Sequence, residues 1–250
     1  DQLLSMEKIW EFSQTVNIED VREVLDRQIA CNMAIANEGM ANAWGAQIGK
    51  VMLATFGEGI TTRASAWAAA GSDARMDGCE MPVVINSGSG NQGITVSVPV
   101  VMYADELGVS EDTRYRALVL SNLIALHLKR GIGTLSAYCG AVSAGAAASG
   151  AIAYVLGGGF DEVVHAVVNT LSVTSGMVCD GAKPSCAAKI AMSLNAGILG
   201  CAMYEHGQQF FGGDGIVKKG VENTIESVCR LGREGMRATN DEIIAIMLEK

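Results

Sequence analysis

Apolar and polar residues alternate along most of this chain with the period of a helix that is buried on one face. After the polar segment 17–20, in which Asn17 is suited to cap a helix, the pattern predicts one long helix that reaches Phe56. Residues 1–10 have the character of the first turns of another helix. Further helices are predicted over 61–75, 94–107, 115–130, 134–156, 161–177, 184–204, 217–231 and 240–249.

Few segments depart from the helical period. The run 82–85, Pro-Val-Val-Ile, has strand character, and Gly-rich segments at 86–93, 157–159 and 212–215 predict loops. Because no repeat, low-complexity linker or charge run divides the sequence, we expect one domain over residues 1–250. The predicted fold class is mainly α: a single globular domain of packed helices with a buried Gly/Ala-rich central helix and few or no strands.

The segment 131–160 carries no charged residue, and its length would satisfy a membrane span. Its residues are mostly Gly, Ala and Ser rather than Leu, Ile and Phe, and no second span accompanies it. Small side chains also let helix backbones approach closely inside a protein core. We therefore favour a buried helix and expect no membrane partner.

Composition narrows the functional class. A net charge of −9 with 18 Lys and Arg argues against a nucleic-acid partner and favours small-molecule chemistry. Seven cysteines without regular spacing indicate a reducing compartment, so we expect a cytoplasmic protein. The chain opens on Asp1, without Met or a signal peptide, which suggests part of a longer polypeptide. We expect a homodimer, the commonest assembly.

Three cysteines, Cys139, Cys179 and Cys186, lie in runs crowded with Gly, Ala and Ser, where thiols would meet little but backbone and each other. Three thiolates can hold a cubane iron–sulfur cluster and leave its fourth iron open to a substrate. Their spacing matches neither a ferredoxin run nor a zinc knuckle, and a buried cysteine is often a small apolar side chain, so both interpretations remain open. A structural role is favoured for the remaining cysteines, Cys31, Cys79, Cys201 and Cys229.

The polar, Gly-rich segment 86–93 leads into a helix, and its free N–H groups and hydroxyls suit a carboxylate or a phosphate. It is no Walker loop, which disfavours nucleotides, and an ordinary turn is the alternative. Lys183 is suited either to bind a substrate carboxylate or to form a loop salt bridge. The three histidines are scattered, and no hydrolase or zinc motif occurs. The candidate substrate-binding residues are Asn86, Ser87, Gly88, Ser89, Asn91, Gln92 and Lys183.

The segments 88–93, 133–140 and 175–186 resemble the cysteine desulfidase family, relatives of the alpha chain of bacterial iron–sulfur L-serine dehydratases. The resemblance covers most of the chain and implies a [4Fe-4S] cluster held by Cys139, Cys179 and Cys186. The implied activity is α,β-elimination of L-cysteine to hydrogen sulfide, ammonia and pyruvate, without a pyridoxal lysine. The alternatives are L-serine deamination and a non-catalytic cluster-binding or ligand-binding domain.

The catalytic base is unknown. Members of the resembled family carry an additional N-terminal region with a Gly-Cys-Thr-Glu-Pro motif whose Cys is thought to act as the base, and this sequence lacks that motif. The resemblance therefore implies that this chain is the cluster-bearing part and that the missing N-terminal region of the same polypeptide is its partner.

Overall fold

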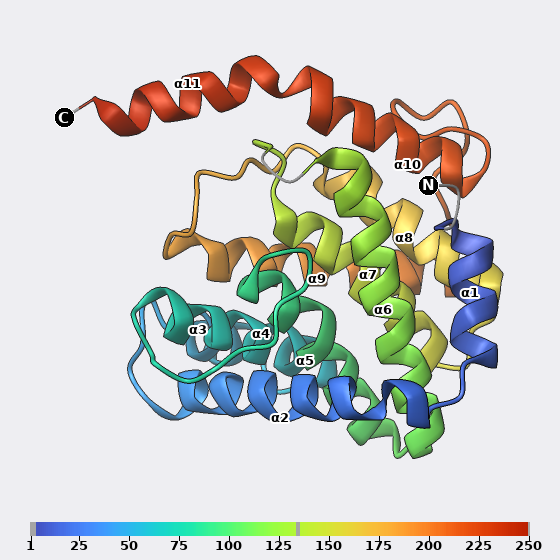
Figure 1. Cartoon of the computed structure of the whole chain (residues 1–250), viewed down its shortest axis with the longest axis horizontal. Helices are drawn as coiled ribbons and strands as arrows, with labels where there is room; N and C mark the ends of the chain where they lie inside the picture. The colour runs from blue at the N-terminus through green and yellow to red at the C-terminus, as the bar shows by residue number, and fades with distance from the viewer. Residues whose placement is uncertain (1–3, 134–135, 250) are drawn as a thin grey trace.

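The computed structural model describes residues 4–133 and 136–249, and within these ranges the chain folds into helices without a β-strand (Figure 1). Two isolated bridges, Asn86 with Ser89 and Tyr138 with Val178, are the β-type pairs of these ranges. The mainly α prediction is confirmed. The helices are α1 (Met6–Thr15), α2 (Glu19–Ala41), α3 (Ile48–Phe56), α4 (Ile60–Met76), α5 (Gly90–Leu107), α6 (Glu111–Ile132), α7 (Gly140–Val155), α8 (Phe160–Thr174), α9 (Ser185–Glu205), α10 (Val221–Arg230), the π-helical turn η1 (Leu231–Gly235) and α11 (Arg237–Leu248).

Helix α7 is the predicted central helix, and all its residues except Gly140 and Tyr154 are buried. It packs against α5, α6, α8 and α9. A Cβ on Gly145 would lie 1.7 Å from Ser193 Oγ of α9, so only glycine allows the observed approach. Ser193 Oγ also donates a hydrogen bond of 2.8 Å to Ala141 O. Small residues thus hold α7 and α9 at close range.

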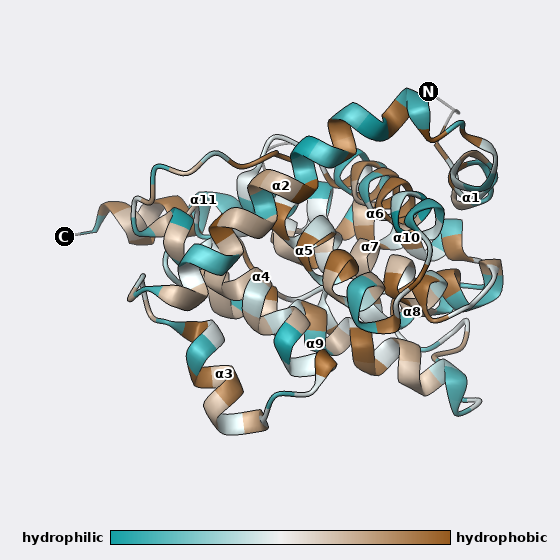
Figure 2. Cartoon of the chain, turned by 90° about the horizontal axis from the view of Figure 1, so that it is seen from below, coloured by the Kyte–Doolittle hydropathy of each residue, from teal (hydrophilic) through white to brown (hydrophobic). Residues whose placement is uncertain are grey.

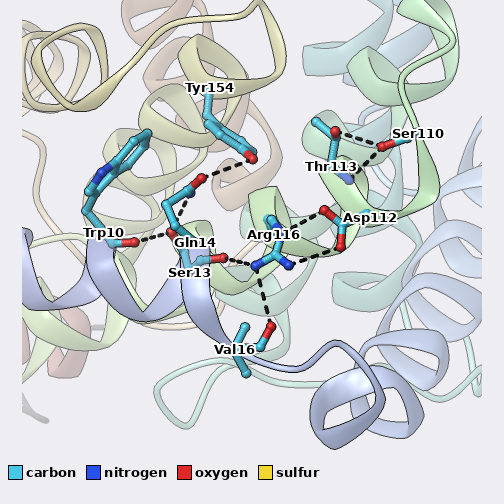
Figure 3. Close-up of polar contacts among 9 residues, drawn as sticks. All are labelled: Trp10, Ser13, Gln14, Val16, Ser110, Asp112, Thr113, Arg116 and Tyr154. Carbon is cyan, nitrogen blue, oxygen red and sulfur yellow. Dashed lines mark hydrogen bonds and ion pairs between the residues drawn. The ribbon is translucent and has the colours of Figure 1, made fainter.

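Helix α1 is docked onto α6 by Arg116, as Figure 3 shows. Arg116 Nη1 donates to two carbonyl oxygens at the end of α1, Ser13 O at 2.9 Å and Val16 O at 3.4 Å. Asp112 holds the same guanidinium from one turn earlier on α6. A cation is favourable at a helix C-terminus because the last carbonyl groups lack partners within the helix.

The surface helix α2 is amphipathic, and in Figure 2 it carries both hydrophilic and hydrophobic bands. Its start agrees with the prediction to within a residue or two, because Asn17 Oδ1 accepts the N–H of Glu19 at 3.3 Å. The prediction of one helix as far as Phe56 is wrong, since residues 42–47 separate α2 from α3.

Asp73 of α4 provides the physical reason for this break. Its carboxylate is buried and accepts the N–H of Ile48 at 2.7 Å and that of Ala46 at 3.3 Å. The turn before α3 also contains Gly45 with a φ of 53°. A buried carboxylate from another helix therefore caps a new helix where the local pattern would continue the old one.

The run 82–85 forms no strand. The backbone of Val84 instead pairs with the Asn32 side chain, which donates to Val84 O at 3.1 Å and accepts its N–H at 2.9 Å. Helix α5 then begins at Gly90, earlier than the predicted residue 94, because Ser89 caps it and accepts the N–H of Gln92 at 3.4 Å. Half of the predicted loop is therefore the first turn of a helix.

Other boundaries differ from the predictions by a few residues. The helix predicted from 134 begins at Gly140, and its first two predicted positions lie outside the described residues. The uncharged segment 131–160 is divided between the end of α6 and the buried α7. In the described ranges, α9 has the length and composition of a membrane span, but core helices share these properties, and α9 packs against α4, α7 and α8.

Candidate functional site

Backbone hydrogen bonds place Cys139 and Cys179 side by side. The N–H of Cys139 donates to Met177 O at 3.1 Å, and the N–H of Cys179 donates to Ala137 O at 2.6 Å. Across the antiparallel bridge between Tyr138 and Val178, the two cysteines are diagonal neighbours on one face. Two of the three predicted cluster ligands are therefore held by main-chain contacts.

Cys186 reaches the same region from the first turn of α9. Its Sγ accepts the N–H of Lys183 at 3.5 Å and donates to Gly181 O at 3.5 Å. Burial raises the pKa of the Cys139 thiol, and the nearby thiols of Cys179 and Cys186 raise it further. The three predicted ligands thus interact electrostatically, although they come from different segments.

The donor types fit an iron–sulfur cluster, because all three groups are thiols, and Cys139 interacts electrostatically with both Cys179 and Cys186. Within residues 4–133 and 136–249, however, no three His, Cys, Asp or Glu side chains lie close enough together to hold a metal ion. The site therefore has the donor atoms for a cluster, but its three thiols do not lie close enough together in this structure to bind one metal ion.

Two lysines that sequence reasoning missed lie near these thiols. Lys129, in the last turn of α6, is half-buried and interacts electrostatically with Cys179 and Cys139. Burial lowers its pKa, while the two thiols act in the opposite direction. Lys189, three residues after Cys186 on α9, pairs with Asp180. The predicted Lys183 is exposed.

Gln92 connects the Gly-rich segment with the thiol site. Its side chain packs against Gly140, the residue after Cys139, where an added Cβ would lie 2.7 Å from Gln92 Nε2. Gln92 is only 6% exposed, and its Oε1 has no hydrogen-bond partner in the described structure. A buried acceptor without a partner costs free energy, which is typical of a place that a ligand completes.

The rest of the predicted loop faces elsewhere. Asn86 Nδ2 donates to Asn122 O at 3.2 Å and to Asn122 Oδ1 at 3.0 Å, and Ser87 Oγ donates to Asn86 Oδ1 at 2.7 Å. Asn86 and Ser87 border an apolar groove of about 350 Å³ between α1, α2 and α6. Asn91 accepts from Arg75 Nη1 at 3.2 Å. The structure therefore brings only Gln92 of the predicted loop to the cysteines, while Ser89 serves as the cap of α5 and Gly88 has open space around it.

The remaining cysteines have the environments expected of structural residues. Burial raises the pKa of Cys201 to about 12 and that of Cys229 to about 11. Cys31 and Cys79 are half-buried. The histidines are likewise engaged, since His127 contacts Glu222 at 2.9 Å and His165 stacks on Tyr204.

Comparison with known proteins identifies the family of this chain. The profile of the serine dehydratase alpha chain family matches residues 2–245. UPF0597 proteins of Desulfitobacterium hafniense, Lachnoclostridium phytofermentans and Finegoldia magna are 59%, 50% and 46% identical to this chain over 100%, 98% and 99% of its length. The chain spans 58%, 59% and 59% of those relatives. It belongs to the serine dehydratase alpha chain family.

Proposed function

We propose that this chain is the cluster-bearing part of a lyase that catalyses α,β-elimination of a small L-amino acid, with L-cysteine as substrate and hydrogen sulfide, ammonia and pyruvate as products. The family relation supports a lyase or dehydratase role. The choice of L-cysteine as the substrate is a more specific proposal, which goes beyond this family relation. The cytoplasmic location and the homodimer remain predictions.

The proposed cofactor is a [4Fe-4S] cluster held by Cys139, Cys179 and Cys186. Their mutual electrostatic interaction and the main-chain bonds that hold the first two support this assignment. When bound, the cluster would supply a Lewis acid for the negative charge of the leaving group. For all three thiols to bind one cluster, Cys186 would have to move toward Cys139 and Cys179. Cys186 follows the loop 181–184, in which Gly181 has a φ of 90°.

The observation that carries the proposal is the position of Gln92 beside Gly140. Its unpartnered Oε1 is suited to accept a hydrogen bond from the substrate ammonium. Lys129, a half-buried cation beside Cys139 and Cys179, is the better candidate than exposed Lys183 for the substrate carboxylate. We propose that Asn86, Ser87, Gly88, Ser89 and Asn91 act by holding the loop that presents Gln92.

The second candidate substrate is L-serine, which the description of the matching family favours. Elimination of hydroxide instead of thiolate would use the same groups of the protein. The catalytic base is proposed to lie outside this chain, because the relatives extend well beyond the part that it matches.

Anaerobic iron–sulfur reconstitution tests the cluster. The parent chain is expected to bind four irons and four sulfides and to absorb at about 400 nm, since thiolate–iron charge transfer falls there. Cys139→Ala, Cys179→Ala and Cys186→Ala should each lose the absorbance and the iron, while Cys31→Ala should retain both. Retention of the parent's iron content in all three site variants would exclude these ligands.

Steady-state kinetics of the full-length polypeptide tests the substrate and Gln92. Formation of sulfide and pyruvate is measured with L-cysteine, and formation of pyruvate with L-serine. The substrate with the higher kcat/KM is the better candidate. Gln92→Ala is expected to lower kcat/KM about 10-fold to 100-fold, as loss of a hydrogen bond to a charged group does. Gln208→Ala, at an exposed position, is the matched control. Unchanged kinetics in Gln92→Ala would remove Gln92 from the substrate site.

A further inference from the structure

The third thiol is placed differently from the other two. Cys139 and Cys179 are held by main-chain hydrogen bonds across one bridge, whereas Cys186 lies beyond the exposed loop 181–184. Its helix α9 is anchored on α7 two turns later, where Ser193 Oγ bonds to Ala141 O at 2.8 Å. The first turn of α9 therefore needs another contact to fix Cys186 against its neighbours.

An ion pair provides this contact. Lys189 lies three residues after Cys186, on the same face of α9, and its Nζ pairs with Asp180 Oδ1. Asp180 directly follows Cys179 in the chain. The ion pair therefore connects the two ends of the segment that joins Cys179 to Cys186. In the part of the chain that the structure describes, no other side-chain pair crosses this loop.

Lys189 also lies close to the sulfur atoms. Its side chain is 18% exposed, and it interacts electrostatically with Cys139 and Cys186. Burial acts to lower the pKa of Lys189, but the hydrogen bond to Asp180 and the electrostatic attraction of Asp180 and the two thiols together outweigh burial, and the pKa is raised. Lys189 is thus a largely buried cation that Asp180 pairs beside the thiol site.

We propose that Asp180 and Lys189 are positioning residues of the thiol site, whose ion pair sets the separation between Cys179 and Cys186. This inference rests on the proposed function, in which Cys179 and Cys186 bind the same cluster and must therefore lie at a defined separation. Neither residue needs to touch the substrate. The Asp180 side of the pair is 42% exposed, and ion pairs that are open to solvent contribute little to stability, so the pair is expected to act on the geometry of the site more than on folding.

Cross-linking of the metal-free protein with dibromobimane, which joins two thiols only at short range, measures this separation. The full-length polypeptide is used, and mass spectrometry identifies the product that joins Cys179 to Cys186. We expect its yield to fall several-fold in Asp180→Asn and in Lys189→Met, and to be retained in Lys189→Arg, which keeps the charge. Arg63→Met, which removes the exposed Arg63–Glu106 ion pair of 2.5 Å between α4 and α5, is the matched control and should cross-link like the parent.

Parent-like yields in both Asp180→Asn and Lys189→Met would overturn the proposal, as would an equal loss in Lys189→Arg. Circular dichroism and the urea midpoint show whether each variant is folded. If Lys189→Met is unfolded, Asp180→Asn decides, because that side chain is 42% exposed and keeps its shape. Iron binding is measured separately, so the expected cross-linking pattern in a protein that binds no iron would support the positioning role while refuting the proposed cluster.

Discussion

At the scale of single residues, two polar groups of the candidate site are withdrawn from water. Gln92 Oε1 is buried and unpaired in the described structure, and the ammonium of Lys129 has lost much of its hydration. Such groups cost free energy in the folded protein unless a ligand or a neighbouring charge compensates them. We propose that a bound substrate compensates both groups, because both lie near Cys139.

Asp73 shows the opposite case, a buried carboxylate with a structural role. Burial raises its pKa above the ordinary value of 3.8, and the N–H groups of Ile48 and Ala46 offset only part of that effect. The folded state thus binds this proton more tightly than the unfolded chain. The contribution of Asp73 to stability is greatest below 3.8 and is lost as the pH rises through the folded-state pKa.

Asp73→Asn removes this titration. The free energy of unfolding of the parent relative to the variant is expected to decline as the pH rises from 3.8 through the folded-state pKa, and then to stay constant. Urea denaturation of both proteins over a series of pH values measures the difference. A difference that does not change with pH would show that the pKa of Asp73 is unshifted.

At the scale of helices, the packing of α7 on α9 connects stability with the thiol site. Helix α7 begins directly after Cys139, and α9 carries Cys186 in its first turn. Gly145 allows the two helices to meet. The separation of these cysteines therefore depends on the same contact that fills the core.

Gly145→Ala tests this contact. The added Cβ would lie 1.7 Å from Ser193 Oγ, and Ser193 is fully buried. We expect the free energy of unfolding to fall by about 2 kcal/mol from overpacking, despite the roughly 1 kcal/mol by which Ala favours a helix over Gly. Gly176→Ala, with nothing within 4 Å, should leave it unchanged or slightly higher. Equal urea midpoints for Gly145→Ala and the parent would contradict the tight contact.

At the scale of the whole molecule, Glu222 connects helix α10 to the rest of the chain. Its carboxylate accepts the N–H of Met6 at 2.6 Å and contacts His127 Nε2 at 2.9 Å, which joins α10 to the start of α1 and to α6. Burial opposes ionisation, but the bonds from His127 and Met6 outweigh it and lower the pKa of Glu222 below 4.5. Its contribution to stability is present above 4.5 and is lost as the pH falls through the lowered value.

Glu222→Gln keeps the shape and removes the charge. The variant is expected to lose about 1 kcal/mol at neutral pH, a value reduced because the side chain is 39% exposed, and the loss should fade in acid. Hydrogen exchange of α10 and α1, together with urea unfolding, measures the effect. Glu226→Gln, at a side chain that is 69% exposed, is the control and should exchange like the parent. An equal effect in both variants would rule out a specific role for the Glu222 contacts.

The sequence by itself determined the helical class and the buried central helix. These features follow from local patterns, because the spacing of apolar residues encodes which face of a helix is buried. The Gly- and Ala-rich run predicted α7, and its small side chains are what its neighbours require. The cap residue Asn17 likewise predicted the start of α2 to within a residue or two.

Only the tertiary structure decided which distant groups become partners. Asp73 breaks the predicted long helix, and Asn32 pairs with Val84 in place of a neighbouring strand. Lys129 and Lys189 are half-buried near the thiols, whereas the predicted Lys183 is exposed and contacts Cys186 through its backbone N–H. Of the predicted loop, only Gln92 reaches the cysteines. The physical reason is that hydrogen bonds, ion pairs and burial depend on distances in space between segments far apart in the chain, which periodicity along the chain does not specify.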